Sequence, residues 1–160
     1  MIRKATLEDA SQIMNIYNYY VDHSIFTFDT EHTKLNEIQD KIQMTMDIYP
    51  WIVYEVDGEI FGYAYGSEWK AKHGYKHSAE TTVYLKNDSI KNGLGTLLYK
   101  ELINQLKELK FHALMGCITL PNDASIRLHE KFGFEKVGHF KEVGYKFDNW
   151  IDAGYWELRI

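Results

Sequence analysis

A β-rich segment that runs through two glycines into an amphipathic helix constrains the fold of this 160-residue chain more than any other feature. The segment "SAETTVYL" at 78–85 is rich in β-branched and aromatic residues, which favours a strand. Over 95–109 the apolar residues recur at helical spacing, at Leu98, Leu102, Ile103 and Leu106. A further strand is predicted at "HALMGCITL", 112–120. Because two strands joined by a crossover helix run parallel, the pattern predicts an α/β fold.

The segments before this unit add two helices and a hairpin. A short strand at 2–4 precedes a first helix with Thr6 as its N-cap, and a second helix is expected over 34–49, where Pro50 ends the apolar repeat. The segments "WIVYEV" and "EIFGYAYG" flank Asp57-Gly58, which is a strong signal for a tight turn between antiparallel strands.

The segments after the unit add one helix and two strands. "PNDASIRLHEKFGF" predicts a helix that opens on an Asn or Asp cap and closes at Gly133. Strands are expected around "EKVGHFKEV" and "AGYWELRI". No repeat, low-complexity tract or linker divides the chain, so we expect a single domain over 1–160 with a mixed sheet.

Charge and hydropathy exclude several classes of partner. The formal net charge is -5 and no run of five like charges occurs, which argues against binding to nucleic acid or an anionic membrane. No apolar run reaches 18 residues, and the first ten residues do not resemble a secretory signal. We therefore expect a cytoplasmic protein. The one cysteine, Cys117, is interpreted as a small buried apolar residue in preference to a nucleophile.

The glycines of "NGLGTLL" fit three kinds of corner to different degrees. A P-loop requires Gly-Lys-Ser/Thr, but Thr96 follows Gly95 directly, and the dinucleotide fingerprint requires a third glycine where Leu98 stands. An ordinary strand-to-helix turn stays open as an interpretation. The remaining alternative is an anion site, because glycines let backbone N–H groups converge at a helix N-terminus.

A second segment, "NDASIRLHEKFGF", favours the anion site, because with the glycine corner it resembles the GCN5-related N-acetyltransferase (GNAT) superfamily. The family pattern Asn-x-x-Ser/Ala-x-x-Leu-Tyr-x-Lys-x-Gly-Phe is matched by Asn122, Ser125, Leu128, Lys131, Gly133 and Phe134. In the other family pattern, Gln/Arg-x-x-Gly-x-Gly/Ala, Ile90 replaces the first residue. Lys91 is one step away and offers a point charge in its place.

The resemblance extends to the phosphinothricin and methionine sulfoximine acetyltransferases, over residues 2–156. It implies a GNAT-type, strongly twisted mixed sheet flanked by helices, acetyl-CoA as cosubstrate, direct acetyl transfer to the α-amine of a small amino-acid analogue, a role in detoxification, and a homodimer. It also implies a set of acetyl-CoA-binding residues: Val83, Tyr84, Leu85, Lys91, Asn92, Gly93, Leu94, Gly95, Thr96, Asn122 and Ser125. Among them, a backbone N–H within 83–85 is expected to polarise the thioester carbonyl.

Glu80 and His129 are the expected acid/base pair. Full proton transfer from a free α-ammonium to a model glutamate is uphill by roughly 5 kcal/mol, whereas selecting the neutral amine at pH 7 costs about 1.4 kcal/mol. Glu80 is therefore expected to take the proton as the tetrahedral intermediate forms. His129 stands where the wider family has tyrosine, and the resemblance gives it an active-site role. A core histidine is the alternative interpretation, and Glu80 ranks above it.

Substrate recognition is expected from an aromatic residue and a basic loop. Phe28 is assigned to one wall of the pocket, and Tyr145 and Trp150 to another wall or to packing. The loop "WKAKHGYK" offers Lys70, Lys72 and Tyr75 to a carboxylate or phosphinate, with a solvated loop as the alternative. Since the subfamily has arginine at the position of Lys72, a weaker bidentate contact is expected here.

No metal is predicted, because Gly74 interrupts the His73–His77 pair and no third ligand is evident. Two other functions stay open: acetylation of a protein or peptide N-terminus, and a non-catalytic acyl-CoA sensor.

Overall fold

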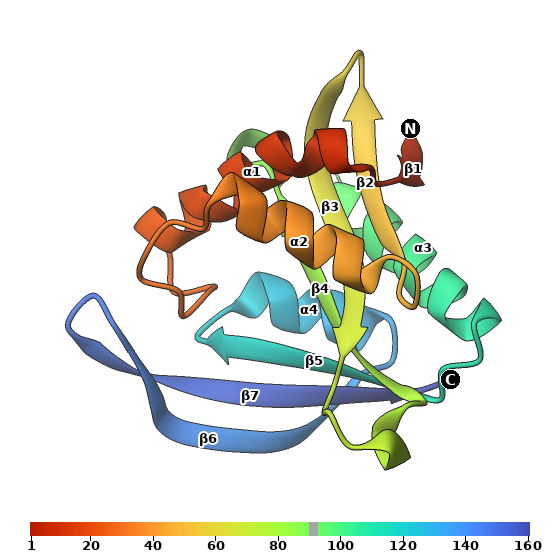
Figure 1. Ribbon diagram of the computed structural model, residues 1–160. Coiled ribbons are helices and arrows are strands. Elements are labelled where there is room, and N and C mark those ends of the chain that lie inside the picture. The colour runs from red at the N-terminus through yellow and green to blue at the C-terminus, as the bar shows by residue number, and fades with distance from the viewer. Residues whose placement is uncertain (90–92) are drawn as a thin grey trace.

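Seven strands form one sheet in the order β1-β2-β3-β4-β5-β7-β6 (Figure 1). This computed structural model describes residues 1–89 and 93–160. The strands are β1 Ile2–Lys4, β2 Trp51–Val56, β3 Glu59–Glu68, β4 Ser78–Leu85, β5 Ala113–Leu120, β6 Glu135–Lys146 and β7 Asn149–Arg159. Only the β4–β5 pair runs parallel within these described strands, so the predicted mixed sheet of an α/β fold is confirmed.

The helices cover both faces of the sheet (Figure 1). Helices α1 (Ala10–His23) and α2 (Leu35–Thr45) pack on one face, and α3 (Leu94–Glu108) and α4 (Asp123–Lys131) on the other. Three short 3-10 turns, at Leu7–Asp9, His73–Tyr75 and Asn87–Ser89, connect the larger elements. Within residues 1–89 and 93–160, none of the helices has the length and apolar character needed to cross a lipid bilayer.

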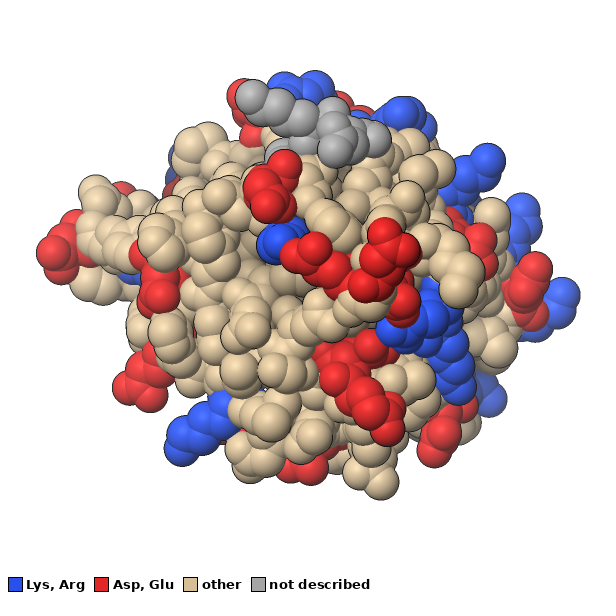
Figure 2. Space-filling view, turned by 90° about the horizontal axis from the view of Figure 1, so that it is seen from above, with Lys and Arg blue, Asp and Glu red and all other residues tan. Residues whose placement is uncertain are grey.

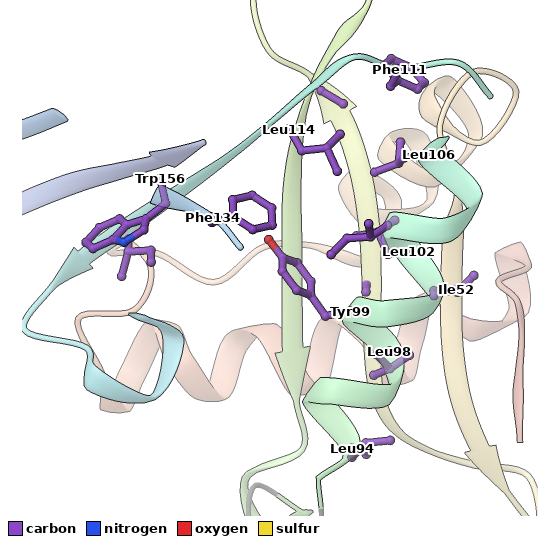
Figure 3. Close-up of a cluster of buried hydrophobic side chains, with 14 residues drawn as sticks. Ile52, Leu94, Leu98, Tyr99, Leu102, Leu106, Phe111, Leu114, Phe134 and Trp156 are labelled. Atoms are coloured by element: carbon purple, nitrogen blue, oxygen red, sulfur yellow. The ribbon is translucent and has the colours of Figure 1, made fainter. Parts of the chain in front are cut away.

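The core on the α3 face holds the parallel strands against the crossover helix (Figure 3). The leucines predicted to share one face of α3 are fully buried there. Tyr99 of α3 is also fully buried, and its hydroxyl lies 2.7 Å from Thr81 Oγ1 of β4. Thr81 in turn donates to the Met115 carbonyl of β5 at 3.1 Å. This chain of bonds joins α3, β4 and β5 next to the point where the two strands separate.

The core on the α1/α2 face is aromatic. Trp51 of β2 and Tyr65 of β3 stack with ring centroids 4.0 Å apart, and Tyr63 lies parallel to Tyr65 at 6.3 Å. Tyr63 also approaches Tyr84 of β4 at 5.8 Å. Such stacks add to the stabilisation that burial of their area provides. These rings form an aromatic layer between the sheet and helices α1 and α2.

Two helix boundaries differ from the sequence predictions. Thr6 precedes a 3-10 turn, and α1 begins only at Ala10; the Thr6 N–H instead donates to the Asp9 carboxylate at 2.8 Å. Helix α2 ends at Thr45, because a turn over 46–49 brings the chain to Pro50 in extended form.

The C-terminal hairpin is longer than predicted. Strands β6 and β7 continue to a two-residue turn at Phe147 and Asp148, both with positive φ. That turn type normally carries Asn-Gly or Asp-Gly, so the sequence signal was missing. By contrast, the predicted turn at Asp57-Gly58 joins β2 to β3 with positive φ at both residues.

Candidate active site

A gap in the sheet between β4 and β5 forms the centre of the site. The two strands pair only from Ser78 to Glu80, opposite Ala113 to Met115, and β4 continues to Leu85 without that neighbour. Thr81, Val83 and Leu85 of β4 and Ile118 and Thr119 of β5 line the cavity that opens beyond the pairing. Because the edge of a strand presents backbone donors and acceptors, this gap is a place where a ligand with amide groups can bind.

The direction of the β4 backbone can be read from its neighbour β3. The N–H of Lys86 donates to the Phe61 carbonyl at 2.9 Å, so alternate N–H groups of β4, including that of Tyr84, face β3. The N–H groups of Val83 and Leu85 therefore face the gap. The Leu85 carbonyl on the same side accepts a bond from the Tyr20 hydroxyl of α1 at 2.7 Å. Of the three residues predicted to contact the thioester, Val83 and Leu85 have the appropriate backbone direction.

A cavity of about 500 Å³ occupies the gap and continues along α3 and α4. Most of the described residues that the sequence assigned to the site line it: Phe28, Glu80, Val83, Tyr84, Leu85, Gly93, Gly95, Thr96, Asn122, Ser125 and His129. Leu94 does not line it, because its side chain is buried in the core against the sheet. The predicted contacts of Lys91 and Asn92 lie outside the described residues.

The α3 end of the cavity contains a helix N-terminus. Gly93 adopts φ of 70°, a left-handed conformation that favours glycine, and α3 begins at the next residue. The Leu97 N–H donates to the Gly93 carbonyl at 3.2 Å, and the N–H groups of 94–96, which precede it, have no carbonyl partner among residues 1–89 and 93–160 within the helix. Their dipoles and the helix dipole attract negative charge.

Two cations from α4 add to this end of the cavity. Arg127 and Lys131 both line it, and Lys131 Nζ donates to Thr96 Oγ1 at 3.3 Å. Asn122 fixes the start of α4 because its Oδ1 accepts the Ser125 N–H at 3.1 Å. Neither cation was predicted as a binding residue, although Lys131 belongs to the matched family pattern. Their spacing of four residues, one helical turn, is the signal that could have indicated a shared face.

Glu80 lies at the point where β4 and β5 separate. Burial raises the pKa of its carboxyl group, and the positive charge of Lys41 on α2 opposes that rise. Its side chain is on the α1/α2 face, because its neighbours Ala79 and Thr81 face α3. A carboxylate with a raised pKa beside an open gap is suited to accept a proton.

His129 is a buried side chain with only 4% of its surface exposed. Its Nδ1 lies 2.8 Å from the Ser125 carbonyl and therefore carries the proton, which leaves Nε2 as an acceptor without a partner in the described residues. The ring packs against Gly116 of β5 and between Tyr99 and Phe134. Burial lowers the pKa of His129, so the ring is neutral near pH 7. Glu80 and His129 thus approach the gap from opposite faces of the sheet.

The sequence and the fold have counterparts in known proteins. Residues 2–154 match the model of the acetyltransferase (GNAT) domain family. The chain belongs to the GNAT family. A phosphinothricin N-acetyltransferase of Streptomyces viridochromogenes is 38% identical over 156 residues, which cover 98% of this chain and 85% of that protein. An L-methionine sulfoximine/L-methionine sulfone acetyltransferase of Pseudomonas paraeruginosa is 31% identical, with 99% and 94% covered.

Two solved structures of acetyltransferases show the same fold. A GNAT superfamily phosphinothricin acetyltransferase of Sinorhizobium meliloti in complex with acetyl-CoA has a TM-score of 0.96 at 26% identity, with 100% of this chain and 88% of that chain covered. A ribosomal-protein-alanine N-acetyltransferase of Brucella melitensis has a TM-score of 0.95 at 34% identity, with 100% and 99% covered. The expected family is confirmed.

The wall of this GNAT cavity that faces α1 consists of residues that the sequence analysis largely missed. Tyr20, Phe26 and Thr27 line it together with Phe28. The Tyr84 hydroxyl of β4 donates to the Phe26 carbonyl at 3.0 Å, which ties this connection between α1 and α2 to the sheet. No local motif marks such a wall, because its parts come from segments about 60 residues apart in the chain.

The basic loop and two of the predicted aromatic residues lie outside the cavity. Lys70, Lys72 and Tyr75 are exposed in the connection between β3 and β4, which leads into the strand that carries Glu80. Tyr145 and Trp150 pair at 4.8 Å on the β6–β7 hairpin, and both are more than half exposed. The structure therefore places the loop beside Glu80 in the chain but not among the cavity residues.

Cys117 is exposed, so the interpretation of a buried side chain is wrong. It lies on β5 opposite Tyr155 of β7 and lines the cavity on the Glu80 side of the sheet. Desolvation and the nearby Glu80 charge raise the pKa of its thiol. A thiol with a raised pKa is a poor nucleophile at pH 7. Across residues 1–89 and 93–160, no group of three or more His, Cys, Asp or Glu side chains is arranged to hold a metal.

Proposed function

We propose that this GNAT protein transfers an acetyl group from acetyl-CoA directly to the α-amine of a small amino-acid analogue. The observation that carries the proposal is the gap between β4 and β5, which has the N-terminus of α3 at one end and Glu80 at the other. The Sinorhizobium relative, solved with acetyl-CoA, supports the choice of cosubstrate. The relatives that act on phosphinothricin and methionine sulfoximine support the class of amine.

Acetyl-CoA would bind along the cavity with its diphosphate at the start of α3. The N–H groups of Gly95 and Thr96 and the cations Arg127 and Lys131 would contact the phosphates. The N–H groups of Val83 and Leu85 would bind amide or thioester oxygens, because β5 does not pair with β4 at these residues. Asn122 and Ser125 line the next part of the cavity, beside His129. The contacts predicted for Lys91 and Asn92 stay predictions.

Glu80 would act as the general base. The amine nitrogen attacks the thioester carbonyl carbon, the nitrogen loses a proton to Glu80 directly or through water, and the C–S bond breaks to release the CoA thiolate. Because a thiol has a pKa near ~8.5, the leaving group needs little help from an acid. The burial of His129 Nε2 against Gly116 favours a positioning role for this ring over proton donation.

The amine would enter from the α1/α2 face, where Glu80, Tyr84 and Phe28 line the cavity. The aromatic wall suits a substrate whose side chain is short and apolar. We propose that Lys72, with Lys70 and Tyr75, contributes from the β3–β4 connection to recognition of the anionic group. A point charge in place of a planar guanidinium favours a carboxylate over strict bidentate binding of a phosphinate.

A second candidate is acetylation of a protein N-terminus, which the Brucella relative favours by its name and its 34% identity. The two candidates differ in the size of the acceptor. A screen that measures free CoA thiol would compare methionine sulfoximine, methionine sulfone, phosphinothricin and an Ala-initiated peptide. Turnover of the small amines is expected, and turnover of the peptide alone would transfer the proposal to the second candidate. Turnover of none of them would leave only an acyl-CoA sensor.

A homodimer is part of the proposal, and the β6–β7 hairpin is the surface that supports it. Six large apolar side chains of this hairpin are more than half exposed: Val137, Phe140, Val143, Tyr145, Phe147 and Trp150. Exposed apolar patches of this kind mark interaction surfaces.

Acidic and basic side chains are interspersed on the face in Figure 2, which supports a partner other than nucleic acid. A cytoplasmic location stays a prediction.

A further inference from the structure

Lys146 is a buried ammonium that the proposed chemistry does not use. Its side chain lies near the end of β6 with 3% of its surface exposed, and it is the one lysine among the buried charged residues of the described chain. Burial lowers its pKa, while Asp29 and Asp22 oppose the effect without forming an ion pair with it in the described residues. A buried charge of this kind requires hydrogen-bond partners.

The partners of Lys146 are two carbonyl groups of the α1–α2 region. Lys146 Nζ donates to the Thr27 carbonyl at 3.0 Å and to the Tyr20 carbonyl at 3.4 Å. Tyr20 belongs to the last turn of α1, and its carbonyl also accepts the Ser24 N–H and hydroxyl, each at 3.2 Å. The helix dipole attracts a cation to this end of α1. The ammonium thus joins β6 to the end of α1 and to the connection that follows it.

Gly144 makes a second contact between the same segments. The Phe28 ring lies so close to this glycine that a Cβ at position 144 would be 2.3 Å from Phe28 Cε1 and Cζ. Only a residue without a side chain leaves room for the ring in its observed position. The hairpin extends past the end of β5 toward the α1–α2 connection, as Figure 1 shows. Gly144 and Lys146 therefore contact two adjacent residues of that connection.

The contacted residues form a wall of the active-site cavity. Thr27 and Phe28 line it, and Phe26 beside them accepts the Tyr84 hydroxyl at 3.0 Å. The wall is thus held from β4 on one side and from the hairpin on the other. In contrast, the described α3 end of the cavity is lined by Gly93, Gly95 and Thr96 and by side chains of α4, and makes no contact with these two hairpin residues.

We propose that Gly144 and Lys146 are positioning residues for the amine: the hairpin fixes Phe28 and Thr27, and so sets amine binding without taking part in acetyl-CoA binding. The effect on the amine KM rests on the proposed function. The effect on the structure of residues 24–29 rests only on the contacts described above. A displacement of about 1 Å at a positioning group is enough to change kcat/KM substantially.

The experiment compares two glycine variants of the same hairpin. Gly144→Ala forces the Phe28 ring to move, whereas Gly138→Ala adds a methyl group that meets its nearest neighbour, Tyr155 Cβ, at an ordinary 3.9 Å. We expect Gly144→Ala to raise the amine KM about tenfold, with kcat and the acetyl-CoA Kd changed less than twofold. Gly138→Ala should leave all three values unchanged. Equal behaviour of the two variants, or an equal loss of acetyl-CoA binding, would overturn the proposal.

Hydrogen exchange of the free protein supplies a readout that does not depend on any amine. Lys146→Met should speed amide exchange over 24–29 relative to α3, and Gly144→Ala should do the same to a smaller extent. Lys141→Met, at an exposed site of the same strand, is the matched control. Unchanged exchange at 24–29 in the alanine variant at 144 would refute the positioning role even if no acceptor amine were found. A wild-type protein without transferase activity but with the expected exchange would refute only the proposed function.

Discussion

The two ends of the active-site cavity are built in different ways. The cofactor end uses the start of α3 and one face of α4, so its groups come from short contiguous segments and several of them are backbone N–H groups. The amine end uses side chains from α1, β4, β5 and the α1–α2 connection, with support from β6. Backbone donors suit a ligand part that is constant, whereas side chains can differ from one relative to another. The cofactor end therefore provides the chemistry that is general to the fold, and the amine end provides the specificity for the substrate.

The largest expected effect tests the reacting centre, where both ends meet. Glu80→Gln should lower kcat by about 100-fold, within the range that a positioned general base contributes, because the amide cannot accept the proton. The acetyl-CoA Kd should change less than twofold. Steady-state kinetics and calorimetry measure the two quantities. Glu68→Gln, at the exposed end of β3, is the control. Loss of acetyl-CoA binding in the Glu80 variant would show that its role is structural.

The second prediction concerns the cofactor end alone. Lys131→Ala should weaken acetyl-CoA binding about tenfold, since it removes a charge-assisted contact at the helix start. The loss should shrink at high salt. Titration calorimetry at two ionic strengths measures both effects. Lys100→Ala, on an exposed position of α3, should leave the Kd unchanged. A change in the amine KM without a change in the acetyl-CoA Kd would break the division between the two ends.

A smaller effect is expected at the basic loop between β3 and β4, which lies outside the cavity. Lys72→Ala should raise the amine KM about threefold with kcat unchanged, because a contact between exposed charges contributes less than about 1 kcal/mol. Lys76→Ala, in the same connection, serves as the control. Kinetics with methionine sulfone at fixed acetyl-CoA gives the values. No difference between the two variants would remove the basic loop from the amine end.

The smallest effect is on stability. Because burial raises the pKa of Glu80, its ionised form is less stable in the folded protein than in the unfolded chain. Glu80→Gln should therefore raise Tm by about 2 °C at pH 7. The gain should vanish below the ordinary pKa of glutamate, where the carboxyl is protonated in both states. Thermal unfolding at pH 7 and pH 4 checks the sign, and a gain that grows with acid would contradict it.

The sequence predicted the local parts of the fold and not the long-range ones. The β4–α3–β5 unit and the Asp57-Gly58 hairpin follow from apolar spacing and turn residues within single segments. The Phe147–Asp148 turn was missed because its two residues adopt positive φ without glycine. Cys117 was assigned to the core because a strand pattern alone does not say which face is open. The side chain of a residue on an α/β sheet is exposed only where the covering helices leave space.

The site shows the same limit. The glycine corner and the Asn122 cap are local, and they could be recognised. Arg127 was not assigned to the site because the spacing shows only that it shares a helical face with Lys131, and that face lines the cavity only after α4 has packed on the sheet. The contacts of Lys146 with Thr27 and Tyr20 span more than 110 residues, so that no window of the sequence contains them.

The separation of β4 from β5 has a mechanical consequence. Backbone pairing between the two strands covers Ser78–Glu80 and Ala113–Met115, so the sheet consists of two blocks with a narrow joint. A molecule that fills the gap would contact both strands and hold the two blocks together. Binding in the gap should then reduce sliding of one block against the other. Proteases should therefore cut the ligand-free protein faster than the ligand-bound protein.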